Sequence, residues 1–167
     1  VYIRGGSILP RKMRLRRSSK LMFYDPYTLI ITPTPAPSGS GEGVVSHAEG
    51  QLYLDDETTL AHERQAAYAH REFKYSATAT QATIRCSKAT VDETSEDNGK
   101  PSYDATNTVE RIVIADQGRP PSRVSLTTVG SHEVSEVEFI YDKASRTLTI
   151  KKPSVLVTRD WVVTVAY

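Results

Sequence analysis

The feature that most constrains the fold of this chain is how its β-branched and aromatic residues are distributed. They recur in short segments, often with a period of two, and turn-forming residues separate the segments at short intervals. Apolar residues spaced for an amphipathic helix are nearly absent. This pattern is typical of antiparallel sheets packed face to face. We therefore predict an all-β chain that forms β-sandwich structure.

The same pattern places the strands. Near the end of the chain, Leu148 and Ile150 alternate with polar residues, and the polar residues 142–145 connect this segment to the one before it, which predicts a hairpin. Residues 161–165 predict a largely buried strand. The full set of predicted strands is 1–4, 12–16, 28–32, 50–54, 68–77, 81–87, 109–115, 122–128, 134–141, 146–151 and 161–167.

Two polar stretches interrupt the strands. Residues 33–43 carry three prolines followed by glycine and serine, and proline cannot donate to a sheet ladder, so we expect an exposed, mobile loop there. Residues 92–107 begin with four carboxylates and predict a solvated insertion. A calcium site is the alternative, although the ligand spacing of an EF-hand is not present. The carboxylates are Asp92, Glu93, Glu96 and Asp97.

These breaks predict a division of the chain. Residues 1–36 are expected to complete a proximal β-sandwich, residues 37–49 to form a flexible linker, and residues 50–167 to form a whole distal antiparallel β-sandwich. Because Val1 opens directly on a strand-like segment, we expect the chain to be a piece of a larger protein.

Composition argues against two classes of protein. A net charge of +1 with 25% charged residues lacks the basic excess of a nucleic-acid-binding domain. No run of about 18 apolar residues exists, so no membrane-spanning helix is predicted. The single cysteine, Cys86, cannot form an intrachain disulfide and is expected to be a small buried side chain rather than a reactive thiol.

Asp55 and Asp56 follow a strand and are the obvious candidates for acid chemistry. Retaining glycosidases hold two carboxyl groups about 5 Å apart on either side of the scissile bond. Neighbouring residues on a strand point to opposite faces, so these two would not flank one sugar unless the turn bends sharply. We interpret them as caps of the following turn.

A dense basic run follows the first segment. Phosphate or polyanion binding is one interpretation, and an acidic partner surface is another. Since Met13 and Leu15 alternate with charged residues, we favour a half-buried edge strand with a charged solvent face. The run consists of Arg11, Lys12, Arg14, Arg16, Arg17 and Lys20.

The other reactive residue types are scattered. No two of the histidines, His47, His62, His70 and His132, have the close spacing of a zinc pair. Gly5-Gly6 lacks the pattern of a phosphate loop, and Ser18-Ser19 lacks a triad context. We therefore predict no catalytic, cofactor-binding or metal-binding residues in this chain.

Two aromatic residues are candidates for stacking on a sugar, Tyr53 and Trp161. Trp161 lies within an apolar strand and is interpreted as a core residue.

Several segments, in order along the chain, resemble glycoside hydrolase family 31, and in particular its glucosidase II branch. They are residues 2–10, 14–19, 25–29, 50–56, 71–76, 109–114 and 151–161. The segment 50–56, Gly-Gln-Leu-Tyr-Leu-Asp-Asp, is the most informative of them. The chain departs from the family where Glu57 stands in place of the usual glycine, and in the long stretch 33–46.

The resemblance implies more than the residues show by themselves. In this family a catalytic barrel is followed by proximal and distal β-sandwiches, and the catalytic aspartates lie in the barrel. It implies a retaining α-glucosidase of the endoplasmic reticulum lumen that removes α-1,3-linked glucose from N-glycans. The implied partners are the barrel and N-terminal domains of the α-subunit, a β-subunit and the N-glycan. This chain would brace the barrel without acting alone; a carbohydrate-binding or subunit-docking module is the alternative.

Overall fold

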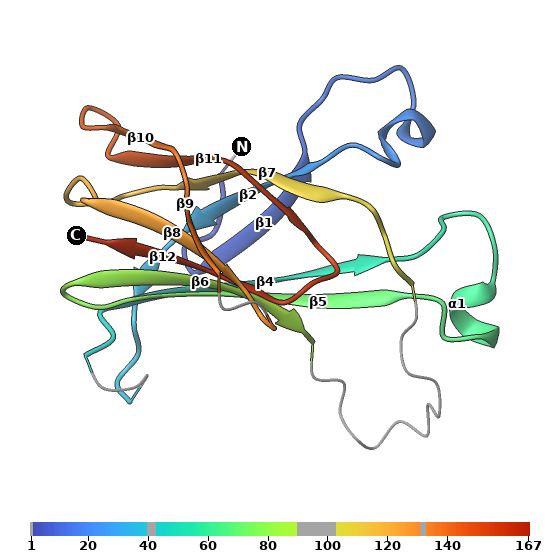
Figure 1. The fold of residues 1–167 in the computed structure, drawn as a ribbon, viewed down its shortest axis with the longest axis horizontal. Helices are drawn as coiled ribbons and strands as arrows, with labels where there is room; N and C mark the ends of the chain where they lie inside the picture. The colour runs from blue at the N-terminus through green and yellow to red at the C-terminus, as the bar shows by residue number, and fades with distance from the viewer. Residues whose placement is uncertain (1, 40–42, 90–102, 131–132) are drawn as a thin grey trace.

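The computed structural model describes residues 2–39, 43–89, 103–130 and 133–167 (Figure 1). Nearly all regular structure in them is strand, with two short helical turns, η1 (Ser19–Met22) and α1 (Ala61–Arg64). The strands are β1 (Ser7–Lys12), β2 (Tyr27–Thr32), β3 (Thr34–Pro35), β4 (Ser46–Leu54), β5 (Ala69–Ala77), β6 (Gln81–Lys88), β7 (Thr108–Ile114), β8 (Arg123–Thr128), β9 (Val134–Glu136), β10 (Phe139–Asp142), β11 (Thr147–Leu156) and β12 (Trp161–Ala166).

Hydrogen bonds join these strands into one sheet that curls over on itself. The strand order is β10-β11-β7-β2-β1-β4-β5-β6-β12-β8-β9, with β3 against β4. In Figure 1, β10, β11, β7, β2 and β1 form one layer, called here the first layer. The strands that follow β1 in this order, namely β4, β5, β6, β12, β8 and β9, form the second layer. The predicted all-β sandwich architecture is confirmed.

Most neighbouring strands are antiparallel, but two junctions are parallel. β2 runs parallel to β7, and β1 meets β4 through the single parallel pair Ser7 and Glu49. The second junction is the corner where the sheet passes from the first layer to the second.

The core lies between the layers and follows the period of two. In β12, Trp161, Val163 and Val165 are fully buried, whereas Val162 and Thr164 are only half-buried. The Phe73 ring of β5 lies 6.2 Å from that of Trp161. Each such side chain contributes roughly 1.5–3 kcal/mol when it leaves water. The core role predicted for Trp161 is confirmed.

The predicted hairpin near the end of the chain is also confirmed. β10 pairs with β11 in the register Phe139 to Ile150, with residues 143–146 between them. Asp142 caps this connection, since its carboxylate accepts hydrogen bonds from the Ala144 N–H at 3.0 Å and the Ser145 hydroxyl at 2.6 Å.

Three strand predictions were wrong in part or whole. Residues 2–4 form no strand, and β1 covers 7–12 rather than 12–16. The predicted strand 134–141 is two strands. The Val137 N–H bonds to Val124 O of β8, and Glu138 O accepts from the Lys151 N–H of β11. At these two residues the chain therefore crosses from one layer to the other.

The sheet runs across the predicted division of the chain. β1 and β2, from residues 1–36, lie between β4 and β7, which belong to residues 46–54 and 108–114. The last four residues of the predicted linker, Ser46–Glu49, already belong to β4 and pair with β5. The division into proximal and distal parts stays a prediction, and the acidic residues 92–97 lie outside the described residues.

Candidate functional site

The turn after β4 holds the two neighbouring aspartates. Asp55 Oδ1 accepts the Glu57 N–H at 2.8 Å, and Asp56 Oδ1 accepts the N–H groups of Thr58 and Thr59 at 3.1 and 2.9 Å. The Thr59 hydroxyl donates to Asp56 Oδ2 at 2.5 Å. The bond from the Thr59 side chain, followed by the backbone bonds, lowers the pKa of Asp56. Both carboxylates accept the hydrogen bonds that a turn-capping role requires.

Glu57 occupies an unusual backbone conformation in this turn. Its φ of 56° lies in the left-handed region, which favours glycine. A glutamate therefore stands here in a backbone conformation that glycine would adopt with less strain. The Glu57 side chain itself is exposed.

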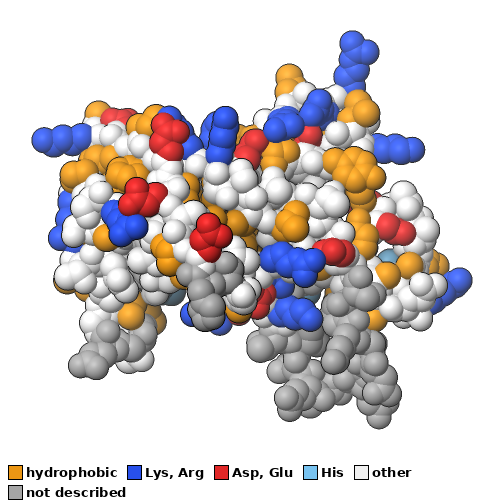
Figure 2. Space-filling model, viewed as in Figure 1, with side chains coloured by type: hydrophobic (Ala, Val, Ile, Leu, Met, Phe, Trp, Pro, Cys, Tyr) orange, Lys and Arg blue, Asp and Glu red, His pale blue; other side chains and the backbone are white. Residues whose placement is uncertain are grey.

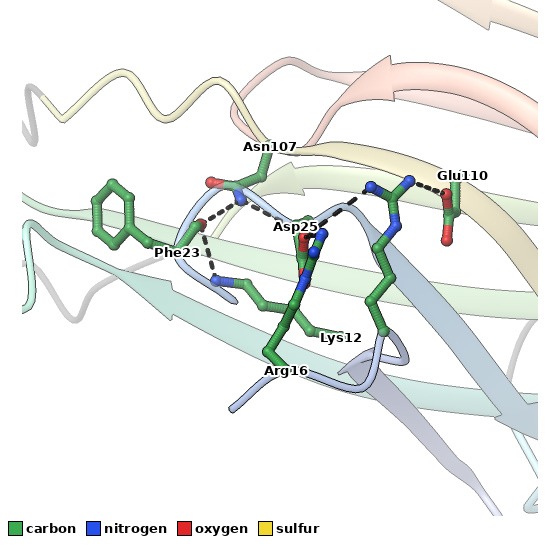
Figure 3. Close-up of polar contacts among 7 residues, drawn as sticks. Lys12, Arg16, Phe23, Asp25, Asn107 and Glu110 are labelled. Atoms are coloured by element: carbon green, nitrogen blue, oxygen red, sulfur yellow. Dashed lines mark hydrogen bonds and ion pairs between the residues drawn. The ribbon is translucent and has the colours of Figure 1, made fainter. Parts of the chain in front are cut away.

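Three residues of the basic run, Lys12, Arg14 and Arg16, belong to a polar network around Asp25 (Figure 3). Arg16 holds the Asp25 carboxylate with two bonds, Nε to Oδ2 at 3.0 Å and Nη2 to Oδ1 at 2.7 Å. Arg14 lies 3.9 Å from the same carboxylate and donates to Glu110 Oε2 at 3.0 Å. A planar guanidinium matches a carboxylate in this two-bond geometry, so the pair has a defined orientation.

Two further groups fasten the same segment through its backbone. Lys12 Nζ donates to Phe23 O at 3.0 Å, and Asn107 Nδ2 donates to Phe23 O at 2.7 Å and to Asp25 O at 2.9 Å. Burial lowers the pKa of Lys12. The edge-strand interpretation is wrong: residues 13–16 form a loop in which Leu15 is fully exposed, and Arg16 is held by Asp25, nine residues away.

The aromatic candidates separate into two environments. Trp161 is fully buried, so it offers no stacking surface. Tyr53 is 49% exposed, and its ring stacks on that of Tyr68 at 5.4 Å and 19°, with His70 at the edge. The two tyrosine rings cover part of each other, and Tyr53 remains partly exposed beside Tyr68.

The histidines and the cysteine are not gathered into a reactive centre. In the described part of the chain, no three His, Cys, Asp or Glu side chains lie close enough together to hold a metal ion; His132 is outside that part. Cys86 is buried, and its burial raises the thiol pKa to about 11. A protonated thiol inside the core is a weak nucleophile, in keeping with the structural role predicted for it.

Sequence reasoning missed an apolar row on the outer face of the first layer. Register places Leu9 opposite Ile30, Ile30 opposite Val113, Val113 opposite Thr149, and Thr149 opposite Ile140. Leu9 is 40% exposed and Ile140 51% exposed, and the two residues between Leu9 and Thr149 are half-buried. We call these five residues the apolar row.

A second row, called here the basic row, consists of Arg11, Arg111 and Lys151. Each of them lies two positions from the member of the apolar row on the same strand, so the two rows run parallel. Arg11 pairs through Thr28 with Arg111, which lies opposite Lys151. Lys151 also makes an exposed ion pair with Glu138 at 3.3 Å. No local motif could reveal either row, because their members lie up to 140 positions apart and meet only through strand pairing. Elsewhere on the surface, charges of both signs are interspersed over the face drawn in Figure 2.

No protein-family model matches this chain. No helix of its described residues is long and apolar enough to cross a membrane. Among curated proteins, the chain is 34% identical over 161 residues to neutral alpha-glucosidase AB of Sus scrofa, covering 96% of this chain and 15% of that protein. The chain thus spans about 15% of the length of such relatives.

Solved structures agree with this similarity. The Tris-bound glucosidase II alpha subunit has a TM-score of 0.66 and 27% identity, covering 98% of this chain and 17% of that one. A heterodimeric complex of ER glucosidase II, made of the catalytic subunit and the binding domain of the regulatory subunit, has a TM-score of 0.66 and 25% identity, with the same coverage. The chain is therefore homologous to one segment of the glucosidase II α-subunit, an α-glucosidase of glycoside hydrolase family 31.

Proposed function

We propose that this chain is a non-catalytic β-sandwich part of a glucosidase II α-subunit, in which it braces the catalytic barrel. The assembled enzyme would be a retaining α-glucosidase that removes α-1,3-linked glucose from N-glycans in the lumen of the endoplasmic reticulum. Its regulatory β-subunit would be the partner. The similarity to about 15% of the length of its relatives supports a role within a larger enzyme.

The apolar row carries the bracing proposal. Four of its five members are aliphatic, they lie side by side across five strands, and the two outermost are 40% and 51% exposed. A row of aliphatic side chains on an outer sheet face, here interrupted by Thr149 alone, is typical of a surface that another part of a protein covers. The catalytic barrel that the family resemblance implies is the occupant that we propose.

The candidate carboxylates give no support to a free-standing enzyme. Asp55 Oδ1 accepts the Glu57 N–H, and both oxygens of Asp56 accept bonds from the turn. Both aspartates are therefore used as caps of the turn, which supports a structural role for them rather than a catalytic one. The chemistry of the assembled enzyme would belong to residues outside this chain.

The test is to produce the rest of the α-subunit and this chain separately, and then to mix them. We expect the chain alone to leave a chromogenic α-glucoside intact and to form a one-to-one complex with the rest of the subunit, seen by native mass spectrometry. The complex should be more resistant to heat inactivation than the rest of the subunit alone. Hydrolysis by the isolated chain, or no complex with a folded remainder, would overturn the proposal.

A docking role toward the β-subunit is the second candidate, and the basic row favours it. Arg11, Arg111 and Lys151 present three cations on one face, which would suit an acidic surface. Binding of the isolated chain to the β-subunit, weakened by salt and by R11E, would support this role. Unchanged binding after that substitution would exclude the basic row from it.

A further inference from the structure

A cleft opens at the end of the molecule where two loops approach each other. One loop contains η1 and the residues after it, and the other is the turn that follows β4; both lie at the right-hand end in Figure 1. The cleft has a volume of about 490 Å³. Its lining residues are Ser19, Lys20, Phe23, Tyr24, Asp56, Glu57 and Thr58. Pockets of about 300–1,000 Å³ are the usual size for a small ligand.

One wall of the cleft is aromatic. The Phe23 and Tyr24 rings meet edge to face, with centroids 4.8 Å apart and planes at 88°. Tyr24 is 76% exposed, although Phe23 O is fastened by Lys12 and Asn107 at 3.0 and 2.7 Å. An exposed ring on a held backbone is a surface on which an apolar ligand face can stack with little loss of freedom.

The other wall is polar, and its groups differ in availability. Asp56 is used by the turn, since its oxygens accept from Thr58 and Thr59. The Glu57 side chain makes no hydrogen bond or ion pair with any residue that the structure describes, and Glu57 is one of the residues that line this wall. Lys20 supplies a donor on the opposite side. The cleft therefore presents one free acceptor and one free donor beside an aromatic ring.

The charges select among ligand classes. Two carboxylates against one ammonium group repel an anion such as phosphate. A saccharide is neutral, has one apolar ring face, and carries hydroxyl groups that both donate and accept. We propose that this cleft binds a neutral saccharide, stacked on Tyr24, with hydroxyls donating to Glu57 and accepting from Lys20. The bracing proposal rests on the apolar row, on the outer face of the first layer, and not on this cleft. A result against one of the two proposals therefore leaves the other unaffected.

The proposal is tested by NMR titration of the full 167-residue chain with methyl α-D-glucopyranoside and with an α-1,3-linked glucose disaccharide. We expect saturable shifts concentrated on the amides of Lys20, Tyr24, Glu57 and Thr58. A ligand of this size in an open cleft should bind with a dissociation constant of about 1–10 mM. No saturable shift up to about 50 mM sugar would overturn the proposal.

Variants separate the cleft from other exposed tyrosines. Y24A and E57Q should each weaken saccharide binding about 5-fold or more, because they remove the stacking ring and the charged acceptor. Y53A, a matched change at a 49% exposed tyrosine outside the cleft, should leave the affinity unchanged. Spectra with native dispersion show that each variant is folded.

Two outcomes with charged probes would contradict the assignment. Tighter binding of tetramethylammonium than of sugar at the same residues would make the cleft a cation site. Saturable binding of inorganic phosphate there would show that Lys20 dominates the electrostatics. A loss of sugar binding in Y53A, with Y24A unaffected, would move the site to the Tyr53 and Tyr68 pair.

Discussion

Asp25 is the residue on which the loop before β2 depends. Its side chain is 5% exposed, yet it carries a charge, because Arg16 donates two hydrogen bonds to it and Arg14 lies 3.9 Å away. The hydrogen bonds from Arg16, followed by the nearby positive charges, lower the pKa of Asp25 from its ordinary value. The charged form is therefore the one that the folded chain stabilises.

The lowered pKa predicts how stability depends on pH. A carboxyl group with a lower pKa in the folded chain contributes stability above its unfolded pKa and loses it as pH falls through the folded value. In R16Q, the pKa of Asp25 should rise toward its ordinary value, and the acid midpoint of unfolding should move to higher pH. A carbon-detected NMR titration of Asp25 measures the shift. R17Q changes an exposed neighbour and should leave both quantities as they are.

Glu57 offers a second test at the scale of one residue. Its φ of 56° is strained for a residue with a side chain, and glycine removes that strain. E57G should raise the free energy of unfolding by about 0.5–1 kcal/mol, after allowing for the greater freedom of glycine in the unfolded chain. Urea titration measures it. T58G, one residue along and outside the left-handed region, should lower the stability by a similar amount.

At the scale of elements, Gly50 decides whether β1 and β4 can form the corner of the sheet. A β-carbon at this position would lie 2.0 Å from Ile8 O, which is backbone and cannot turn aside. The substitution G50A should therefore destabilise the chain by about 2–4 kcal/mol, because one of the two strands must move. Chemical unfolding measures the loss. G118A, where an added carbon meets nothing within 4 Å, is the matched control.

The pair of Arg71 and Asp160 joins β5 to the turn before β12. The Arg71 side chain is 2% exposed; it forms an ion pair with Asp160 and donates to Arg159 O at 2.9 Å. The change D160A leaves a buried guanidinium without its carboxylate, and should cost about 3 kcal/mol of unfolding free energy.

An exposed pair nearby supplies the control for that prediction. Arg159 and Asp104 lie 3.5 Å apart with both side chains largely exposed. Since exposed ion pairs contribute about 0–1 kcal/mol, D104A should change the stability little. Equal effects of the two substitutions in thermal unfolding would mean that burial of Arg71 does not set the energy of its pair.

At the scale of the whole molecule, the apolar row predicts which face meets the rest of the subunit. L9D and I140D place charges on exposed positions of the row, so the isolated chain should keep its unfolding midpoint. Binding to the separately produced remainder of the α-subunit should weaken about 10-fold or more, because a carboxylate would be buried without a partner.

The control for the apolar row lies on the other outer face. V162D changes a half-buried residue of β12 that points away from the core, on the second layer. Its binding to the remainder of the subunit should match that of the unchanged chain in a calorimetric titration. Loss of binding in V162D alone would assign the interface to the second layer.

The predictions from sequence succeeded where neighbouring residues carry the information. The strand Trp161–Ala166 and the hairpin around Asp142 follow from alternation and turn residues within about ten positions. They failed at residues 12–16, where Met13 and Leu15 alternate with charged residues as in a strand. These residues instead form a loop, in which Arg16 binds the carboxylate of Asp25 and Arg14 lies near it. They failed again at Val137, where one apolar run crosses between the layers and pairs with both.

By itself, the sequence determined that this protein is built of strands and which side chains of each strand enter the core, because a period of two assigns every residue to a face. It also carried the resemblance to family 31. Only the tertiary structure decided the order of the strands, with β1 and β2 between β4 and β7, and hence the apolar row, the Asp25 network and the cleft beside Tyr24. These depend on contacts between residues far apart in the chain, which local patterns do not encode.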